Sequence, residues 1–209
     1  KVSKKPPAGT TVLMDGGFPG TPSRLLTAAE AQFHFETLLP VQQKLLDEYA
    51  DLIQRQVAGK QNATTRYASI LAGAENYRKK NLGEMAGADR IDLAKRKQAQ
   101  EDAYRAWIAA DSKRVRDYNP AALDALVTDA NAAALDNARR GTINRAQLLT
   151  AARILYRWSK EREKPNADRE SGYQDRDRLP TEQRLTTIER RFVPAVDRAV
   201  VEQALAGYP

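Results

Sequence analysis

From Thr27 to the end of the chain, the sequence is a succession of helix-forming segments separated by capping residues, glycines and prolines. Thr27 followed by Glu30 has the pattern of a capping box, which begins a helix. Pro40 predicts a kink or a restart, because proline cannot donate a hydrogen bond to the backbone ladder. Gly59 is a typical helix end. With such signals and no repeat period, the chain is predicted to be mainly α-helical, with about eight helices.

The later helices are expected over residues 62–82, 91–110 and 120–140, and over a segment that includes residues 148–158. Gly83 should end the first of these, and Asn144 should cap the last. The second should turn its heaviest apolar residues inward, namely Tyr104, Trp107 and Ile108. The final third should consist of short helices punctuated by Pro165, Pro180 and Pro194.

Composition excludes several classes of site. No cysteine occurs among the 209 residues, so disulfides, thiolate nucleophiles and zinc–thiolate sites are excluded, and His34 is the single histidine. The net charge of +7 could suggest nucleic acid, but acidic and basic residues are interleaved, as in residues 161–164 and 175–178. Such interleaving is typical of a solvated helix surface. No apolar run reaches the roughly eighteen residues that a membrane-spanning helix needs.

Thr10–Met14 is the one segment with a convincing strand pattern, and turn residues follow it at 15–17 and 19–20. A single strand needs partner strands that the remaining sequence does not supply. The N-terminus begins in a polar run without the pattern of a signal segment. We therefore expect the chain to be a piece of a longer protein, in which this orphan strand completes a β-structure.

Asn76 ends an unusually bare face of the helix expected over residues 62–82. The residues three, four and seven positions before it are Gly73, Ala72 and Ser69. The opposite side carries the expected core stripe Tyr67, Ile70, Leu71, Ala74 and Tyr77. A bare face with an uncharged amide permits close approach, either by another helix backbone or by an extended ligand whose polar end the amide holds. From the pattern alone, helix packing is favoured.

No catalytic constellation is recognisable in the sequence. His34 lies between two phenylalanines, with no serine and acid placed to complete a triad, so a packing or surface role is predicted. Adjacent acids such as Asp47 and Glu48 point in different directions on a helix. The glycine-rich residues 15–20 lack the ending of a phosphate-binding loop and are predicted to form a turn. Basic clusters without an aromatic platform do not favour nucleic-acid binding.

Five short motifs occur in a fixed order and are spread over most of the chain. They are Gly17–Gly20 with Thr21 and Arg24, Tyr67–Ser69, Asn76–Tyr77 with Lys79 and Gly83, Lys97 with Trp107, and Arg169–Glu170 with Gly172–Gln174 and Arg176–Asp177. In this order they resemble the bacterial dipeptidyl aminopeptidases of the dipeptidyl-peptidase VII and XI kind. No single motif is as specific as a metal-binding cysteine quartet, but the shared order argues against coincidence.

In that family a chymotrypsin-like double β-barrel carries a His-Asp-Ser triad, and a large helical domain is inserted between the Asp and the Ser. The resemblance implies that residues 1–24 are the end of the catalytic barrel and a connector. Residues 25–209 would be the α-helical domain that covers the active-site cleft, incomplete at its C-terminus. The triad would lie outside this chain, which alone should be inactive. The parent would be a periplasmic or secreted homodimer that releases dipeptides from free N-termini of peptides, and no cofactor is implied.

Asn76 matches by motif position an asparagine that helps to hold the substrate's α-ammonium group in this family. The resemblance therefore shifts the preferred interpretation of Asn76 from packing to substrate binding. The sequence departs from the family pattern at Arg78, where many members have an aromatic residue, and at Thr21, where arginine is usual. The rival hypothesis is a non-enzymatic helical module that binds a protein or nucleic-acid partner through the bare face or the basic clusters.

Overall fold

The computed structural model describes residues 26–208, and every regular element within this range is a helix. This confirms the prediction of a mainly α-helical chain. The strand predicted at Thr10–Met14 lies outside the described residues. None of the helices in the described range combines the length and the apolar content that crossing a bilayer requires.

The first rod consists of α1 (Ala28–Phe33), a π-helical turn (His34–Leu38) and α2 (Leu39–Val57). The Thr27 Oγ1 accepts from the Glu30 N–H (3.2 Å) and the Glu30 carboxylate accepts from the Thr27 N–H (2.8 Å), which confirms the capping box. The π-helical turn immediately precedes α2, whose first turn contains Pro40. A wider turn accommodates the missing proline N–H and the bulk of its ring, so the rod continues without a break. Gly59 has a φ of 72° and follows the end of α2, as predicted.

The second rod, α3 (Gln61–Arg90), runs for 30 residues and returns along α2. The prediction that Gly83 ends this helix is wrong, because α3 continues to Arg90 and the chain turns at Asp92, whose φ is 52°. A glycine inside a helix weakens it by only about 1 kcal/mol, which packing offsets. The core lies mainly between α2 and α3 and takes in the last helix; its buried members are Tyr49, Leu52, Ile53, Val57, Ala63, Tyr67, Ala146, Val196 and Val200.

The next three helices are α4 (Leu93–Ala109), α5 (Ser112–Asp117) and α6 (Pro120–Arg140). The Asn119 side chain accepts from the Ala122 N–H (3.2 Å) and Pro120 occupies the first turn, which confirms the predicted start of α6. Ile108 of α4 is buried, but Tyr104 and Trp107 are 44% and 46% exposed. The prediction that both aromatics point inward is therefore wrong, because α4 packs against α1, α3 and α5 only in part.

The chain ends with α7 (Gln147–Glu161), α8 (Arg178–Arg191) and α9 (Pro194–Ala206). The prediction that Asn144 caps α7 is wrong. Instead, the buried carboxylate of Asp197 accepts from the N–H groups of Gln147 (2.5 Å) and Leu148 (3.2 Å). A side chain from α9 thus caps α7 across 50 residues of sequence. Pro194 begins α9 as expected, whereas Pro180 lies within the first turn of α8, where proline is tolerated.

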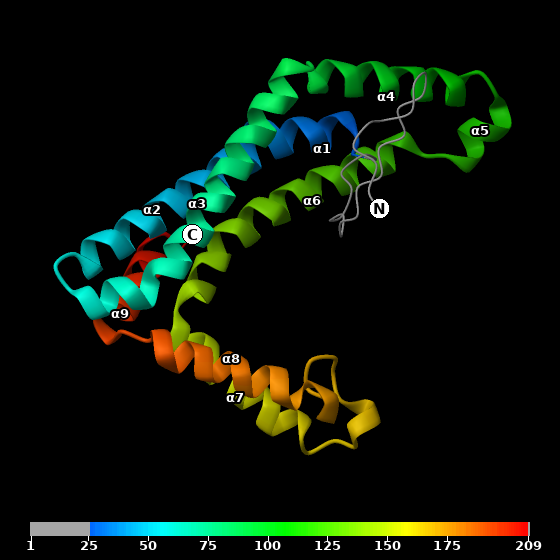
Figure 1. The fold of residues 1–209 in the computed structure, drawn as a ribbon. Coiled ribbons are helices and arrows are strands. Elements are labelled where there is room, and N and C mark those ends of the chain that lie inside the picture. The colour runs from blue at the N-terminus through cyan, green and yellow to red at the C-terminus, as the bar shows by residue number, and fades with distance from the viewer. Residues whose placement is uncertain (1–25, 209) are drawn as a thin grey trace, which may run out of the picture.

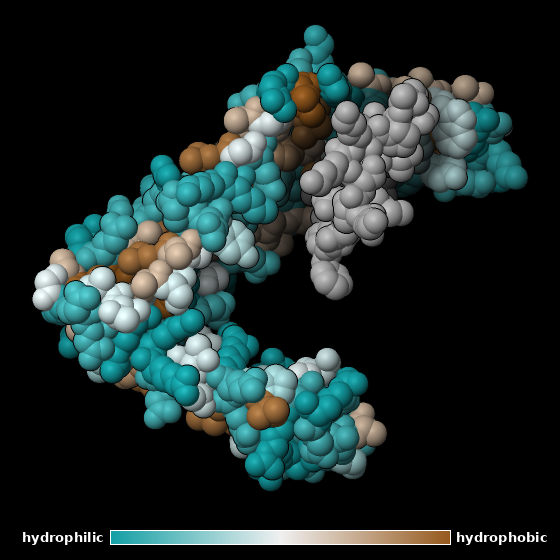
Figure 2. Space-filling model, in the orientation of Figure 1, coloured by the Kyte–Doolittle hydropathy of each residue, from teal (hydrophilic) through white to brown (hydrophobic). Residues whose placement is uncertain are grey.

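Two limbs give the described part of the chain a curved outline (Figure 1). The long limb contains α1, α2, α3 and α6 running roughly alongside one another, with α4 and α5 at its far end and α9 near its base. The short limb is the hairpin of α7 and α8. The space-filling view shows an open, concave side between the two limbs (Figure 2).

Candidate functional site

Asn76 lies on α3, on a face that is open to solvent. Ser69, Ala72 and Asn76 are all exposed, and a Cβ atom added at Gly73 would meet no heavy atom within 4 Å. The Asn76 side chain makes no hydrogen bond to any residue in the range 26–208. Tight packing of another helix against this face, the interpretation that the pattern alone favoured, does not occur within that range. The bare face is an accessible strip of small residues that ends in an unpaired amide.

The opposite side of α3 packs against α2 through polar groups. The Asn81 Nδ2 donates to the Gln43 Oε1 (3.3 Å), and the Gln43 Nε2 donates to the Asp47 carboxylate (2.8 Å). The Arg78 Nε lies 3.8 Å from the same Asp47 carboxylate. Asn81 and Gln43 are both buried, so this chain of groups fixes the position of α3 along α2 one to two turns from Asn76.

Tyr77 is 63% exposed, so its predicted place in the core stripe is wrong. The buried side of α3 instead carries Tyr67, Ala74 and Asn81. Next to it, Arg78 and Asn81 contact residues of α2. Arg78 therefore points toward α2, away from the Asn76 face. Arg78 forms an interhelical ion pair there and also pairs with Glu75 (3.4 Å), the residue before Asn76.

Two lysines continue the Asn76 face toward the C-terminus of α3, because Lys79 and Lys80 stand three and four positions after Asn76. Lys79 pairs with Glu75 (3.8 Å) and Lys80 pairs with Glu84 (3.0 Å). Glu75 also pairs with Arg78 (3.4 Å), so the three cations Arg78, Lys79 and Lys80 face the three carboxylates of Asp47, Glu75 and Glu84. A cationic group that approached Asn76 would meet a polar surface without a net positive field from these two lysines.

His34 lies in the π-helical turn, half-buried, with its ring 4.8 Å from that of Phe35 in an edge-to-face arrangement. Burial lowers the pKa of His34, the Glu84 carboxylate opposes this shift, and Lys80 adds to it. The half-buried ring agrees with the predicted packing or surface role. Among residues 26–208 no cluster of three or more histidine or acidic side chains is arranged to hold a metal ion.

The loop between α7 and α8 carries the last of the sequence motifs. Arg169 donates to the Asp175 carboxylate (2.6 Å) and to the Lys164 carbonyl (3.1 Å), and Asp177 accepts from the N–H groups of Gly172 (3.0 Å) and Gln174 (3.1 Å). Gln174 also donates to the Arg169 carbonyl (3.4 Å), so these bonds stay within the loop and its immediate start. They define the shape of the loop at the tip of the short limb.

Glu161 anchors the same loop, and sequence reasoning missed it. Its carboxylate is buried and accepts from the Lys164 Nζ (2.7 Å) and from the Glu170 N–H (2.8 Å). The hydrogen bond from Lys164, and then that from Glu170, lower the pKa of Glu161. A glutamate within a charged run carries no local signal of burial, so only the return of the chain at Glu170 reveals its role.

The fold and these sites define a helical unit with an open ligand-accessible face, and comparison with known proteins gives its class. The sequence model of the Peptidase S46 family matches residues 1–209, so the chain belongs to this peptidase family. The chain is 33% identical over 192 residues to an Asp/Glu-specific dipeptidyl-peptidase of Shewanella putrefaciens, covering 92% of this chain and 26% of that protein. It is 29% identical over 100 residues to dipeptidyl-peptidase 7 of Porphyromonas endodontalis, covering 47% of this chain and 12% of that protein.

The chain therefore spans about a quarter of the length of the Shewanella relative, and a smaller share of the Porphyromonas relative is matched. These matches confirm the resemblance that the five sequence motifs suggested. They support a dipeptidyl-peptidase relationship for the helical unit as a whole.

Proposed function

We propose that this chain is the helical part of a serine-type dipeptidyl peptidase, in which it covers the active-site cleft and holds the substrate's α-ammonium group through Asn76. In this proposal residues 1–24 end the catalytic β-barrel domain, and residues 25–209 form the cleft-covering domain. The parent is a periplasmic or secreted homodimer. Its serine nucleophile, histidine base and oxyanion hole belong to the other domain, so the chain alone has no activity.

The observation that carries the proposal is the open face around Asn76. Its amide has no partner in the described part of the chain, and the small residues beside it leave room for a peptide end. The position of α3 is fixed from behind by the buried Asn81–Gln43 contact. A binding group on a rigid helix, supported by a second layer of hydrogen bonds, is better placed for recognition than one on a loop.

The chemistry of an amide suits an ammonium ligand. The Asn76 Oδ1 can accept one hydrogen bond from the ammonium group, and the uncharged amide costs less to desolvate than a carboxylate. A peptide whose N-terminus is held at a fixed distance from the serine nucleophile is cut after a fixed number of residues. Anchoring by Asn76 would thus contribute to the release of dipeptides rather than single residues or longer products.

The test compares Asn76→Ala with Asn137→Ala in the full-length polypeptide. Asn137 is an exposed asparagine on α6, so the control makes the same substitution on a helix surface away from α3. We expect kcat/KM for dipeptide release to fall about 30-fold in Asn76→Ala, equivalent to about 2 kcal/mol, and to stay unchanged in Asn137→Ala. Equal effects of the two substitutions would show that Asn76 does not bind the substrate.

The rival hypothesis, an interaction module, has its own supporting observation. The outward side of α7 exposes four large apolar residues, with exposed fractions between 48% and 66%: Leu148, Leu149, Leu155 and Tyr156. Clustered exposed apolar residues often mark binding surfaces for other proteins. If the full-length polypeptide hydrolyses no peptide and instead binds a partner through this side of α7, the peptidase proposal fails and the rival is supported.

A further inference from the structure

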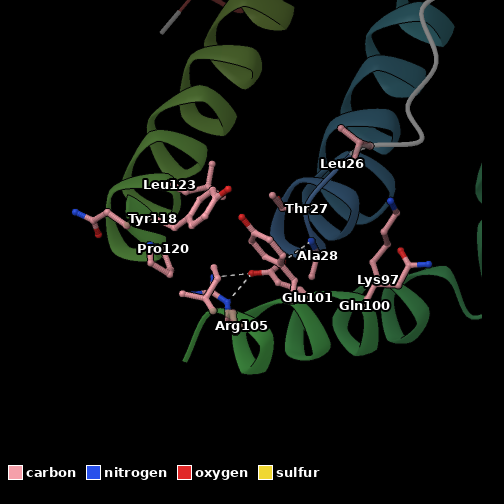
Figure 3. Close-up of a pocket in the computed structure, with 13 residues that line it drawn as sticks. Leu26, Thr27, Ala28, Lys97, Gln100, Glu101, Arg105, Tyr118, Pro120 and Leu123 are labelled. Carbon is pink, nitrogen blue, oxygen red and sulfur yellow. Dashed lines mark hydrogen bonds and ion pairs between the residues drawn. The ribbon is translucent and has the colours of Figure 1, made fainter. Parts of the chain in front are cut away.

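An apolar groove with a volume of about 540 Å³ lies at the far end of the long limb, where the start of α1, the middle of α4 and the start of α6 meet. Figure 3 shows its walls: Leu26 and Ala28 come from the α1 side, Glu101 and Arg105 from α4, and Leu123 from α6. Tyr104, Ile108 and Tyr118 add further apolar surface. Such a volume is typical of a site that holds a bulky group.

Aromatic residues border the groove on one side. Trp107 stacks on Tyr104 at 6.1 Å, meets Tyr118 edge-on at 6.1 Å, and carries the Arg114 guanidinium 4.1 Å above its ring. Between 44% and 46% of each of the three aromatic residues is exposed. Tryptophan, tyrosine and arginine are the residues most enriched where binding energy is concentrated. The rings are thus held in place but remain available for contact.

Two of the three charged side chains that line the groove, Glu101 and Arg105, pair with each other. Glu101 accepts from the Ala28 N–H (2.9 Å) and from Arg105 (2.5 Å), and Arg105 also donates to Asp124 (2.5 Å). This network joins α1, α4 and α6 and needs no charged ligand to balance it. The occupant that the groove suits best is therefore apolar, and an aromatic side chain would pair well with Tyr104 and Tyr118.

We propose that the segment preceding Leu26 binds in this groove and inserts the side chain of Phe18 into it. Phe18 is the only aromatic residue in residues 1–25, and Gly17, Pro19 and Gly20 surround it. Small and turn-forming neighbours present a single bulky side chain without competition from others. The proposal gives the Gly17–Gly20 motif a physical role: it fastens the connector to the helical domain and sets the direction from which the chain enters α1.

The reach of the chain agrees with this occupant. Leu26 itself lines the groove, and Phe18 stands eight positions before it in the sequence. A fully extended segment of that length spans at most roughly 27 Å, and a flexible one averages about 16 Å. A covalently tethered side chain has an effective local concentration in the millimolar range, so it outcompetes free peptides of ordinary affinity.

Disulfide trapping tests the proposal directly, because the 209-residue chain contains no cysteine. The test pair is Phe18→Cys with Leu123→Cys, and the matched control is Phe18→Cys with Leu126→Cys. Leu126 lies one turn further along α6, is 66% exposed and does not line the groove. We expect the test pair to oxidise at least ten times faster than the control, because a disulfide needs Cα atoms within about 7 Å.

Equal oxidation rates would overturn the proposal. If, in addition, a substrate peptide slowed alkylation of the thiol at position 123, the groove would belong to the substrate instead. A double-mutant cycle of melting temperatures provides an independent measurement. We expect Phe18→Ala to lower the melting temperature of the wild-type chain by about 5 °C, and by much less in a Leu123→Ala background. Strictly additive shifts would also contradict insertion of Phe18 beside Leu123.

Discussion

Asp197 should be among the residues on which the stability of the short limb depends most. Its carboxylate is 5% exposed and accepts from the first two N–H groups of α7, at 2.5 Å from Gln147 and 3.2 Å from Leu148. Replacement by alanine removes both acceptors and leaves two helix-end donors unpaired near the core. Replacement by asparagine keeps one acceptor oxygen and removes the negative charge that favours a helix N-terminus.

The expected size of the effect follows from these contacts. A capping side chain contributes about 0.5–2 kcal/mol, and a hydrogen bond to a buried charged group about 1.5–3 kcal/mol. Because the two bonds share one carboxylate, we expect Asp197→Ala to lower the free energy of unfolding by about 3 kcal/mol in total. Asp197→Asn should cost about half as much. For a chain of this length, 3 kcal/mol corresponds to a fall in melting temperature of about 6–12 °C.

Urea unfolding followed by circular dichroism measures this difference, with Glu202→Ala as the control. Glu202 lies on the same helix, α9, and pairs with Arg198 (2.8 Å), but its side chain is 62% exposed. An exposed pair of this kind should contribute less than about 1 kcal/mol. If Asp197→Ala and Glu202→Ala destabilise the chain equally, the cap across α9 and α7 does not contribute as described.

Three further predictions concern single residues. Burial raises the pKa of Tyr67 from its ordinary 10.0 to about 12, so the free energy of unfolding should fall as pH rises from about 10 to about 12. Tyr67→Phe should make that fall smaller in pH-dependent urea titrations, with a remainder from Tyr49, whose pKa burial also raises. The pKa of Glu161 is lowered, so its stabilising contribution is present above the ordinary value of 4.5 and is lost as the pH falls below it. Because the Glu161 carboxylate holds the following loop, Glu161→Gln should speed tryptic cleavage of that loop at neutral pH, whereas Glu163→Gln should not. Thermal unfolding should separate two glycines. Gly172 has a φ of 93°, so Gly172→Ala should destabilise the chain by about 1–3 kcal/mol. Gly83 lies inside α3 with no atom within 4 Å of an added Cβ, so Gly83→Ala should stabilise the chain by about 0.5–1 kcal/mol.

Helix starts were predictable where their signal is local. Thr27 with Glu30, and Asn119 with Pro120, satisfy backbone donors within three residues, so the pattern and the structure agree. The cap of α7 was not predictable in this way, because Asp197 lies 50 residues from Gln147. The nearby Asn144 looked suitable, but its side chain accepts from Arg153 instead (2.6 Å).

Burial was harder to predict than helicity. Periodicity marks which residues share a face, but it does not say where a neighbouring helix ends. Trp107 shares the stripe of Ile108 yet stays half-exposed, and Tyr77 stands one turn from buried Ala74 yet faces solvent. The end of α3 was misplaced because a glycine permits a helix stop without requiring one.

The sequence alone identified Asn76 as a candidate but left two interpretations open. The structure shows that the small-residue face remains uncovered within residues 26–208, and this removes the packing interpretation for that range. The buried pair Asn81 and Gln43 behind this face could not be inferred from the sequence, because polar residues in helices are usually solvated.

The most direct test of ammonium anchoring is the ratio of kcat/KM for one peptide with a free and with an acetylated N-terminus, measured on the full-length polypeptide. Acetylation removes the positive charge and two of the ammonium donors without changing the scissile bond. We predict that the wild type cleaves the free form far faster than the acetylated form, whose slow cleavage is measured at high enzyme concentration. In Asn76→Ala the ratio should fall about 30-fold, because only the activity on the free peptide is reduced. An unchanged ratio in Asn76→Ala would contradict the proposal that this helical domain holds the substrate's N-terminus.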